Sequence, residues 1–287
     1  AIANAQSGNT ITFAANLAGG NTITLTEGQL EIPVGKNLVI DGKNNPNVMI
    51  SGNNSSRVFY LNSTSANPTH LIVKNITIAD GYTSDRGGGI ATTHQGTLTV
   101  DNVMFNDNVA DAGGGAIFSA FEGQLTVTEN SFNRNKAVAG NDERGAGAIA
   151  FWGPNAITVT DSEFIENEGI NGAAINSLNG QLTIENSRFV NNTTTDAFYD
   201  EGNDNPFLRG YGGAIYTDRA STSSDDTSGT IAIRNSVFEG NSGRGEGGAA
   251  YLYTGTQDNV IVESSVFKDN QVLALPDGGN DGNGGAI

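Results

Sequence analysis

Apolar and polar residues alternate with a period of two at six places between residues 98 and 262. At each place two apolar residues flank a single residue, which is threonine in four of the six. The apolar pairs are Leu98/Val100, Leu125/Val127, Ile157/Val159, Leu182/Ile184, Ile231/Ile233 and Val260/Val262. Because successive side chains of a strand point to opposite faces, each pair predicts a β-strand with one buried face.

Two short motifs alternate along the same region. Phe-x-x-Asn follows each apolar pair, at Phe105/Asn108, Phe132/Asn135, Phe164/Asn167, Phe189/Asn192, Phe238/Asn241 and Phe267/Asn270. A Gly-Gly-Ala-Ile-like quartet begins at Gly87, Gly114, Gly145, Asn171, Gly212, Gly247 and Gly284. Successive phenylalanines are 27, 32, 25, 49 and 29 residues apart. A unit of about 25–30 residues that repeats with loop insertions predicts a solenoid, in which each repeat contacts only its neighbours.

Three strands per repeat predict an all-β, right-handed parallel β-helix of the pectate-lyase-like type. The apolar pair forms the first strand, the phenylalanine points inward from the second, and the isoleucine of the quartet points inward from the third. Asn-Ser pairs such as Asn186-Ser187 supply turn chemistry between strands. Equivalent strands pair at roughly 4.8 Å, so we expect ladders of Phe, Asn and Ile along the rod, with the amides hydrogen-bonded to one another.

Residues 1–86 lack both motifs but contain further short apolar runs. We expect strands over 10–13, 22–25, 30–32, 37–40, 48–51, 57–61 and 70–73. The chain is therefore expected to be one β-helix of about ten coils over residues 1–287, with irregular coils over 1–86 and repeat coils over 87–287. Because the sequence stops in the middle of a repeat, at the quartet Gly284–Ile287, we expect an uncapped C-terminal end and a longer parent chain.

Composition narrows the classes of partner. The net charge is −17, which repels phosphate backbones and anionic lipid surfaces, so we expect no nucleic-acid partner. The chain has no cysteine and hence no disulfide or thiolate–metal framework. It has no run of about twenty apolar residues, so we expect no membrane insertion.

The alternating motifs resemble the repeats of the chlamydial polymorphic membrane proteins over about residues 87–287. That resemblance implies a β-helical, surface-exposed adhesin and an extracellular or cell-surface location. The first 80 residues, with runs such as Thr10-Ile11-Thr12-Phe13 and Asn37-Leu38-Val39-Ile40-Asp41-Gly42, resemble the start of CSLREA-type secreted β-helix proteins of environmental bacteria. In that family a short capping helix precedes the strands, and Ala1–Gln6 is similar to its end. The lack of cysteine and of a visible export signal leaves the export route open.

Outward aromatic residues are the first candidate binding groups. They are Phe118, Trp152, Tyr216, Tyr251 and Tyr253, which follow the inward isoleucine position on the parity that the pleat turns outward. Such a row can stack on sugar rings, or it can simply cover neighbouring loops. The largest loops are expected over 136–144, 193–210, 217–229 and 271–283, where coils in register would place them on a rigid scaffold.

Acidic loops are the second candidate. Asp200, Glu201, Asp204, Asp277 and Asp281 are grouped with Gly and Asn. Ca²⁺ takes six to eight oxygens from carboxylates and carbonyls, so these residues form a candidate calcium site. Neither EF-hand spacing nor the full nonapeptide calcium repeat is present, and solvated acidic loops are the alternative.

Catalysis is the main rival to binding, because β-helices also host polysaccharide lyases, hydrolases and epimerases. Such chemistry needs a positioned base or a pair of carboxylates. Equivalent positions of the coils gather no carboxylates, and His70 and His94 fall in different coils without an evident partner. We assign no catalytic residue.

The resulting expectation is a non-enzymatic adhesin segment that binds an extracellular glycan or a surface protein. A polysaccharide-active enzyme on the same fold is the first alternative, and a passive spacer is the second. Uncapped ends also allow end-to-end self-association.

Overall fold

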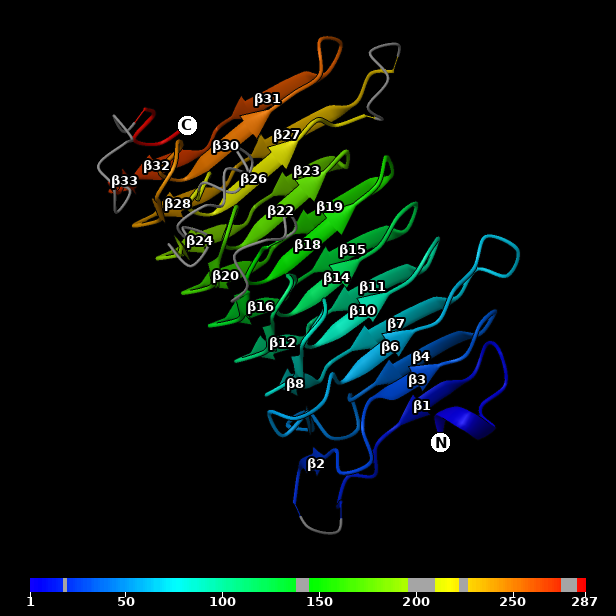
Figure 1. Cartoon of the computed structure of the whole chain (residues 1–287). Coiled ribbons are helices and arrows are strands. Elements are labelled where there is room, and N and C mark those ends of the chain that lie inside the picture. Colours follow the sequence, from blue (N-terminus) through cyan, green and yellow to red (C-terminus); the bar gives the residue numbers. More distant parts are fainter. Residues whose placement is uncertain (18–19, 138–144, 196–209, 222–226, 275–282) are drawn as a thin grey trace.

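The computed structural model describes residues 1–17, 20–137, 145–195, 210–221, 227–274 and 283–287. It shows a parallel β-solenoid whose coils stack into a rod, with the two termini at opposite ends (Figure 1). Apart from the short 3₁₀ turn η1 (Ile2–Asn4), the described elements are all strands. The all-β parallel β-helix predicted from the repeat is confirmed.

Four parallel sheets run along the rod, and we number them in the order in which one coil visits them. Sheet 1 contains nine described strands: β1 (Thr10–Thr12), β4 (Asn37–Asp41), β7 (His70–Lys74), β11 (Thr97–Asp101), β15 (Gln124–Thr128), β19 (Ala156–Thr160), β23 (Gln181–Glu185), β27 (Thr230–Arg234) and β31 (Asn259–Glu263). Sheet 2 contains β2 (Thr22–Thr24), β5 (Met49–Ser51), β8 (Thr77–Ala79), β12 (Met104–Asn106), β16 (Ser131–Asn133), β20 (Glu163–Ile165), β24 (Arg188–Val190), β28 (Val237–Glu239) and β32 (Val266–Lys268).

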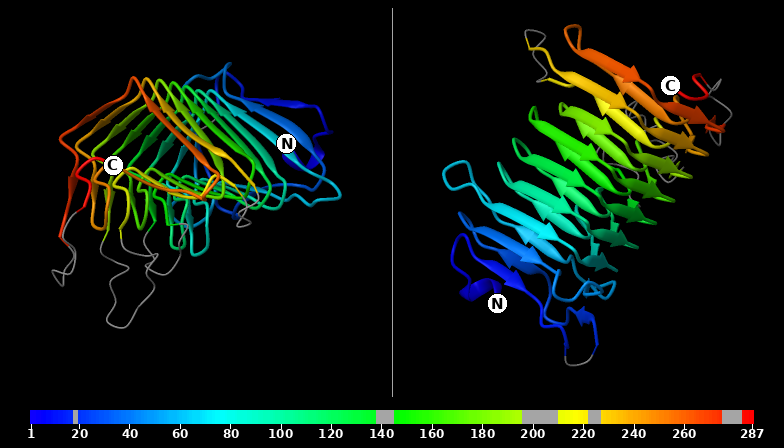
Figure 2. Two further views of the ribbon diagram at one scale, coloured as in Figure 1. Left: turned by 90° about the horizontal axis from the view of Figure 1, so that it is seen from above. Right: turned by 180° about the vertical axis from the view of Figure 1, so that it is seen from behind.

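The two remaining sheets complete each coil. Sheet 3 consists of two-residue strands: β9 (Tyr82–Thr83), β13 (Val109–Ala110), β17 (Lys136–Ala137), β21 (Glu168–Gly169), β25 (Thr193–Thr194), β29 (Ser242–Gly243) and β33 (Gln271–Val272). Sheet 4 contains β3 (Leu30–Ile32), β6 (Phe59–Leu61), β10 (Ile90–Thr92), β14 (Ile117–Ser119), β18 (Ile149–Trp152), β22 (Ile175–Leu178), β26 (Ile215–Asp218) and β30 (Ala250–Tyr253). Each of the seven segments expected upstream of residue 87 contains a strand, and these strands extend sheets 1, 2 and 4. Two further upstream strands, β8 and β9, are not expected from the sequence. Figure 2 shows the coils from above and from behind.

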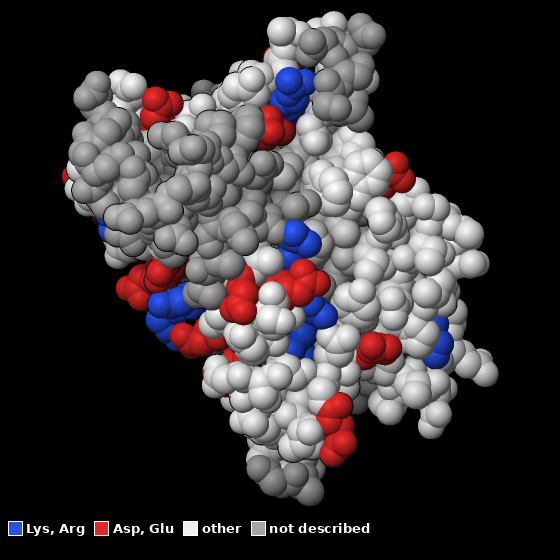
Figure 3. Space-filling view, in the orientation of Figure 1, with Lys and Arg blue, Asp and Glu red and all other residues white. Residues whose placement is uncertain are grey.

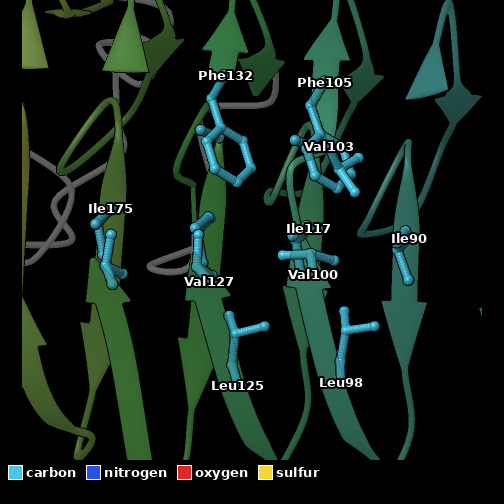
Figure 4. Close-up of a cluster of buried hydrophobic side chains, with 14 of the residues drawn as sticks. Ile90, Leu98, Val100, Val103, Phe105, Ile117, Leu125, Val127, Phe132 and Ile175 are labelled. Carbon is cyan, nitrogen blue, oxygen red and sulfur yellow. The ribbon is translucent and has the colours of Figure 1, made fainter. Parts of the chain in front are cut away.

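The core is built from side chains of like kind that stack in register. Leu98 pairs with Leu71 and Leu125 on the neighbouring coils. The phenylalanines of the motif form one stack with ring centroids 4.6–4.8 Å apart and interplanar angles of 0–5°. The stack consists of Phe105, Phe132, Phe164, Phe189, Phe238 and Phe267. Figure 4 shows the side chains of adjacent coils pointing into the same apolar interior. The spacing of the strands therefore sets the spacing of the rings.

The Asn of each Phe-x-x-Asn motif lies in a second, polar ladder. The Asn167 side chain is completely buried. Its Oδ1 accepts hydrogen bonds from the backbone N–H and from Nδ2 of Asn135, both at 3.0 Å. Its Nδ2 donates to the carbonyl oxygen of Phe132 at 3.0 Å and to Oδ1 of Asn192 at 2.9 Å. Both amide donors and both acceptor sites are thus satisfied, which is what makes a buried amide tolerable.

The two ends of this asparagine ladder differ from its middle. The ladder runs through Asn108, Asn135, Asn167, Asn192, Asn241 and Asn270. At its start, Oδ1 of Asn108 accepts from the backbone N–H of Gly81 at 2.9 Å, because the preceding coil has no motif asparagine. At Asn108 a backbone group therefore takes the place of one neighbouring amide.

The C-terminal end of the ladder is the less protected one. Asn241 is completely buried, and its backbone N–H and Nδ2 both donate to Oδ1 of Asn270 at 2.9 Å. Nδ2 of Asn270 donates to the Phe238 carbonyl oxygen at 2.9 Å. Unlike the other five, Asn270 is only partly buried. Asn108 and Asn241, at 0% exposure, lie too deep to contact an external ligand, and their role is structural.

A serine ladder runs beside the corner between sheets 1 and 2. The backbone N–H of Ser162 donates to Oγ of Ser187, that of Ser187 to Oγ of Ser236, and that of Ser236 to Oγ of Ser265. The Asn-Ser and Asp-Ser pairs predict the turn, and its first residue has a left-handed backbone, with φ of 50° at both Asp161 and Asn186. Asn and Asp tolerate this conformation better than other non-glycine residues. The serine that follows therefore has a structural role, since its hydroxyl oxygen links its coil to the preceding one.

The glycine pairs allow close approach between coils. At the second glycine of the quartet, Gly115, an added Cβ would lie 2.3 Å from the carbonyl oxygen of Gly147 in the next coil. No side chain fits at that distance, so glycine is required there. This close approach accompanies the strands of sheet 3, an additional strand in each coil that a three-strand repeat does not predict. These two-residue strands are too short to leave a period-two pattern in the sequence.

The carboxylate of Asp258 connects backbone segments at one corner of the C-terminal coils by hydrogen bonds. Asp258 accepts hydrogen bonds from the backbone N–H groups of Ala220 and Gly255 at 2.8 Å and of Gly229 at 2.9 Å. Burial opposes ionisation of this carboxyl, but the hydrogen bonds from these N–H groups and from Ser221 outweigh it and lower its pKa below the usual value. The contacts hold together the two ends of segment 220–229.

The Asp258→Asn variant is expected to lose about 1–2 kcal/mol of stability at neutral pH, because an amide cannot replace charge-assisted acceptors on both oxygens. With a depressed folded-state pKa, the stabilisation is present above the unfolded pKa of about 3.9 and is lost as pH falls through the folded value. Urea unfolding between pH 7 and pH 2 should therefore show a steeper acid loss for the parent chain than for the variant. Parallel curves for the two chains would contradict this assignment.

Candidate functional site on the outer face of sheet 4

Two outward rows of side chains run along sheet 4. The inner row, which lies nearer the glycine pairs, contains Tyr60, Ala91, Phe118, Ala150, Asn176, Tyr216 and Tyr251 in register. The outer row contains Trp152, Leu178, Asp218 and Tyr253. All five aromatic residues selected from the sequence thus lie on this one face.

Two of the five are not exposed, although the pleat turns them away from the core. Phe118 is 8% exposed, and the guanidinium of Arg86 lies over its ring at 5.4 Å from the centroid. Tyr216 is 3% exposed, with the ring of Tyr211 stacked 6.2 Å away. The expectation of solvent-exposed rings is wrong at these two positions, because Arg86, which precedes β10 of the neighbouring coil, and Tyr211, which precedes β26, lie against the rings.

The remaining three aromatic residues keep accessible surface. Tyr253 is 48% exposed, and Trp152 and Tyr251 are partly buried. Tyr251 stacks on Tyr211 with ring centroids 4.6 Å apart. Burial and the neighbouring Tyr211 and Glu246 raise the pKa of Tyr251, so its hydroxyl stays protonated and able to donate a hydrogen bond at neutral pH.

An aromatic group forms where sheet 4 turns toward sheet 1. The ring of Phe121 lies 5.4 Å from that of Trp152 and meets that of His94 edge-on at 6.1 Å. Phe121 is not among the candidates chosen from the sequence because it lies in a corner rather than on a strand. The sequence feature that could have identified Phe121 is its position directly before the Glu122-Gly123 turn. This turn corresponds to Gln95-Gly96, which follows His94 in the preceding coil.

A polar groove of about 420 Å³ lies at the same corners. Its lining includes His70, Gln95, Glu122, Gln124 and Asn155. The amide of Gln95 donates to Oε2 of Glu122, and the amide of Asn155 donates to the Glu122 carbonyl oxygen, both at 2.6 Å. These contacts hold the planar polar groups in place from three successive coils. Aromatic rings beside a row of amides and carboxylates suit a ligand with both apolar faces and hydroxyl groups.

Acidic and basic side chains lie next to one another on the view of Figure 3, over the residues that it colours. Described ion pairs away from sheet 4 include Lys74 of β7 with Asp101 of β11 at 2.8 Å, and Arg134 with Asp107 at 2.7 Å in the corners that follow sheet 2. On sheet 4, Oδ1 of Asp218 in the outer row lies 4.0 Å from Nε of Arg219. Burial raises the pKa of the Asp218 carboxyl, and Arg219 opposes that shift.

The candidate metal ligands cannot be placed. Asp200, Glu201, Asp204, Asp277 and Asp281 all lie outside the described residues, as do most residues of the four large loops. Within the described ranges, no three His, Asp or Glu side chains are grouped closely enough to hold a metal ion. His70 and His94 are both exposed. No helix in the described part of the chain is long and apolar enough to cross a membrane.

The fold and this face together define a parallel β-solenoid that displays side chains from successive coils on a rigid outer surface. Residues 102–120 match the Chlamydia polymorphic membrane protein repeat. The matched stretch holds one Phe-x-x-Asn motif, Phe105/Asn108, and the quartet that begins at Gly114. The chain is thus built on a β-helix repeat of the polymorphic-membrane-protein type. No curated protein and no solved structure matches the chain.

Proposed function

We propose that the chain is a non-enzymatic segment of a large secreted or cell-surface bacterial adhesin, and that the outer face of sheet 4 binds a glycan or protein partner. The observation that carries this proposal is the aromatic group of His94, Phe121 and Trp152 beside the amide-lined groove. A surface location is supported by the match to a repeat of chlamydial polymorphic membrane proteins.

The scaffold suits such a role because little in it can move independently. Consecutive coils are joined by backbone hydrogen bonds in four sheets and by the Asn and Ser ladders. Side chains on the outer face therefore keep a fixed spacing, which lowers the ordering cost of binding. An extended ligand would contact equivalent positions of several coils, each adding a small contribution.

The test is a binding screen of the chain against a broad panel of glycans and extracellular-matrix proteins, run once with Ca²⁺ and once with a chelator. Retention of a ligand that is recovered chemically unchanged supports the adhesin proposal. Binding that requires Ca²⁺ would support calcium ligation by the acidic loops, which we retain as part of the proposal. A ligand recovered cleaved or epimerised would replace the adhesin by a polysaccharide-active enzyme, and retention of nothing would favour a spacer.

The Trp152→Ala variant is expected to weaken binding of a ligand found in that screen by roughly 5–10-fold, since it removes one aromatic contact surface worth about 1 kcal/mol. Titration calorimetry with the parent and variant chains measures the change. The matched control is Met104→Ala, which removes an apolar side chain with 47% exposure from sheet 2. Equal affinities for the parent and Trp152→Ala chains would mean that the ligand binds outside this face.

A further inference from the structure

The polar groove at the corners between sheets 4 and 1 runs along the rod rather than across it. Its lining takes two residues from each of four successive coils, namely Pro68 and His70, Gln95 and Thr97, Glu122 and Gln124, and Pro154 and Asn155. At the usual strand spacing, the first and last of these coils are roughly 14 Å apart. The groove is therefore longer than one sugar ring, and it favours a ligand that lies parallel to the rod axis.

A projecting corner bounds one end of the groove. Residues 62–69, which join β6 to β7, form a longer corner than those of the next two coils and project beyond them (Figure 1). The backbone of this corner is folded on itself, since the N–H of Asn67 donates to the carbonyl oxygen of Thr64 at 3.1 Å. Because Pro68 belongs both to this corner and to the lining, the corner forms an end wall of the groove.

The charge of the lining favours a neutral ligand. Of the described residues that line the groove, Glu122 alone is acidic and none is lysine or arginine. Oε2 of Glu122 accepts a hydrogen bond from the Gln95 amide at 2.6 Å, whereas Oε1 has no partner among the described residues. An acidic glycan would bring a second carboxylate toward Glu122 with no cation in the lining to compensate, but a sugar hydroxyl can donate to Oε1.

The groove also presents neutral polar groups and aromatic surface to a ligand. The Gln124 side chain is exposed, and its amide can both donate and accept hydrogen bonds. The rings of Phe121 and Trp152 lie beside the groove, 5.4 Å from each other, and the apolar face of a sugar ring packs well on such rings. Equivalent positions recur about every 4.8 Å along the rod, which is close to the length of one pyranose residue in an extended glycan.

We propose that this groove binds an uncharged glycan in an extended conformation, with the chain of pyranose rings parallel to the rod axis. This inference rests on the proposed function and names the ligand class and its direction at the same site. Successive rings lie over successive coils. Their hydroxyl groups donate to Oε1 of Glu122 and exchange hydrogen bonds with Gln124, and their apolar faces lie toward Phe121 and Trp152.

Titration calorimetry with the whole chain tests this with three tetrasaccharides. Cellotetraose and maltotetraose are both neutral and contain only glucose, but the β-linkages keep cellotetraose extended and the α-linkages make maltotetraose curve. Cellotetraose should bind at least about tenfold more tightly than maltotetraose. It should also bind at least about tenfold more tightly than tetragalacturonate, whose carboxylates meet Glu122.

Two variants locate the binding in the groove. Glu122→Gln should weaken cellotetraose binding by roughly 3–10-fold, because a neutral oxygen is a weaker acceptor than a carboxylate, and it should reduce the difference between cellotetraose and tetragalacturonate. Gln124→Ala should weaken cellotetraose binding by a similar factor. The matched control is Asn37→Ala, which removes an exposed amide from the same row of sheet 1 outside the lining and should leave binding unchanged.

Equal binding of cellotetraose and maltotetraose, tighter binding of tetragalacturonate, or unchanged cellotetraose binding in both variants overturns the inference. Retention of panel proteins without any neutral glycan also overturns it, and the adhesin proposal then stands with a protein partner. If cellotetraose binds in the groove but is recovered as shorter sugars, the groove stands as a site for neutral glycans and the adhesin proposal falls.

Discussion

The Asn167→Asp variant is expected to lose roughly 3–5 kcal/mol of stability at neutral pH, the cost of a buried charge without a counterion. The second carboxylate oxygen replaces Nδ2, which donates to the Phe132 carbonyl and to Oδ1 of Asn192. An oxygen at that position faces two other oxygens instead of donating to them. Because the substitution hardly changes volume, the loss reports the polarity of the ladder rather than its packing.

The loss should depend on pH. Oδ1 still accepts two hydrogen bonds from Asn135, but burial and the two acceptor oxygens that face the second carboxylate oxygen raise the folded-state pKa of the new carboxyl above its unfolded value of about 3.9. The protonated form is then the better tolerated one, so the variant is least destabilised below pH 4 and loses stability as pH rises through the folded pKa. Urea unfolding at pH 3 and pH 7 measures both states. The control Asn102→Asp lies at an exposed corner with φ of 53°, and we expect a change within about 0.5 kcal/mol.

Two results would contradict the prediction for Asn167→Asp. A loss below about 1 kcal/mol at pH 7, or a loss equal to that of Asn102→Asp, would mean that the buried amides do not hold the coils together.

The Phe132→Ala variant is expected to lose roughly 3–5 kcal/mol, which is typical of a buried phenylalanine truncated to alanine. The Phe132 ring is fully buried between Phe105 at 4.8 Å and Phe164 at 4.6 Å. The coils on either side cannot close the gap, because strand pairing fixes their separation. Guanidinium unfolding monitored by circular dichroism gives the change in midpoint and free energy.

The same ladder supplies the control for this change. Phe267 stacks only on Phe238 among the described rings and is partly buried. Phe267→Ala should therefore cost about 1–2 kcal/mol, in proportion to the smaller apolar area removed from water. If the two alanine variants lose equal stability, the stack does not act as a continuous core.

Most of the fold follows from the periodic residues of the chain. The apolar pairs such as Leu98/Val100 lie on sheet 1, and the strands expected upstream, among them 30–32 and 70–73, appear within two residues of the expected bounds. Local pattern is sufficient here because each coil repeats the same inward positions, and parallel pairing with the next coil then aligns them. Strand β8 (Thr77–Ala79) and the strands of sheet 3 are exceptions. In sheet 3, two residues such as Val109–Ala110 carry no recognisable period.

The asparagine ladder shows where a repeated motif stops being informative. All six motif asparagines look alike in sequence, yet Asn108 meets the backbone of Gly81 and Asn270 is only partly buried. A repeat predicts contacts between equivalent coils, and it cannot describe the first and last members, whose neighbours differ.

The candidate site was less accessible to sequence reasoning. The outward parity of Phe118 and Tyr216 places both on sheet 4, but parity does not show that Arg86 and Tyr211 cover them. Phe121 lies in a corner, where side-chain direction depends on the turn and on the adjacent coil. Hydrogen-bonded neighbours in that surface are 27 or more residues apart in the sequence.

The sequence by itself determined the class of fold, the inward ladders and the turn residues, because those depend on side-chain periodicity and on local backbone preference. Only the tertiary structure decided which outward residues are exposed and which meet across coils. The contact of Arg86 with the Phe118 ring and the groove near Glu122 both arise between coils. Their geometry depends on how corners fold over the sheet, and burial and charge pairing there involve residues far apart in the chain.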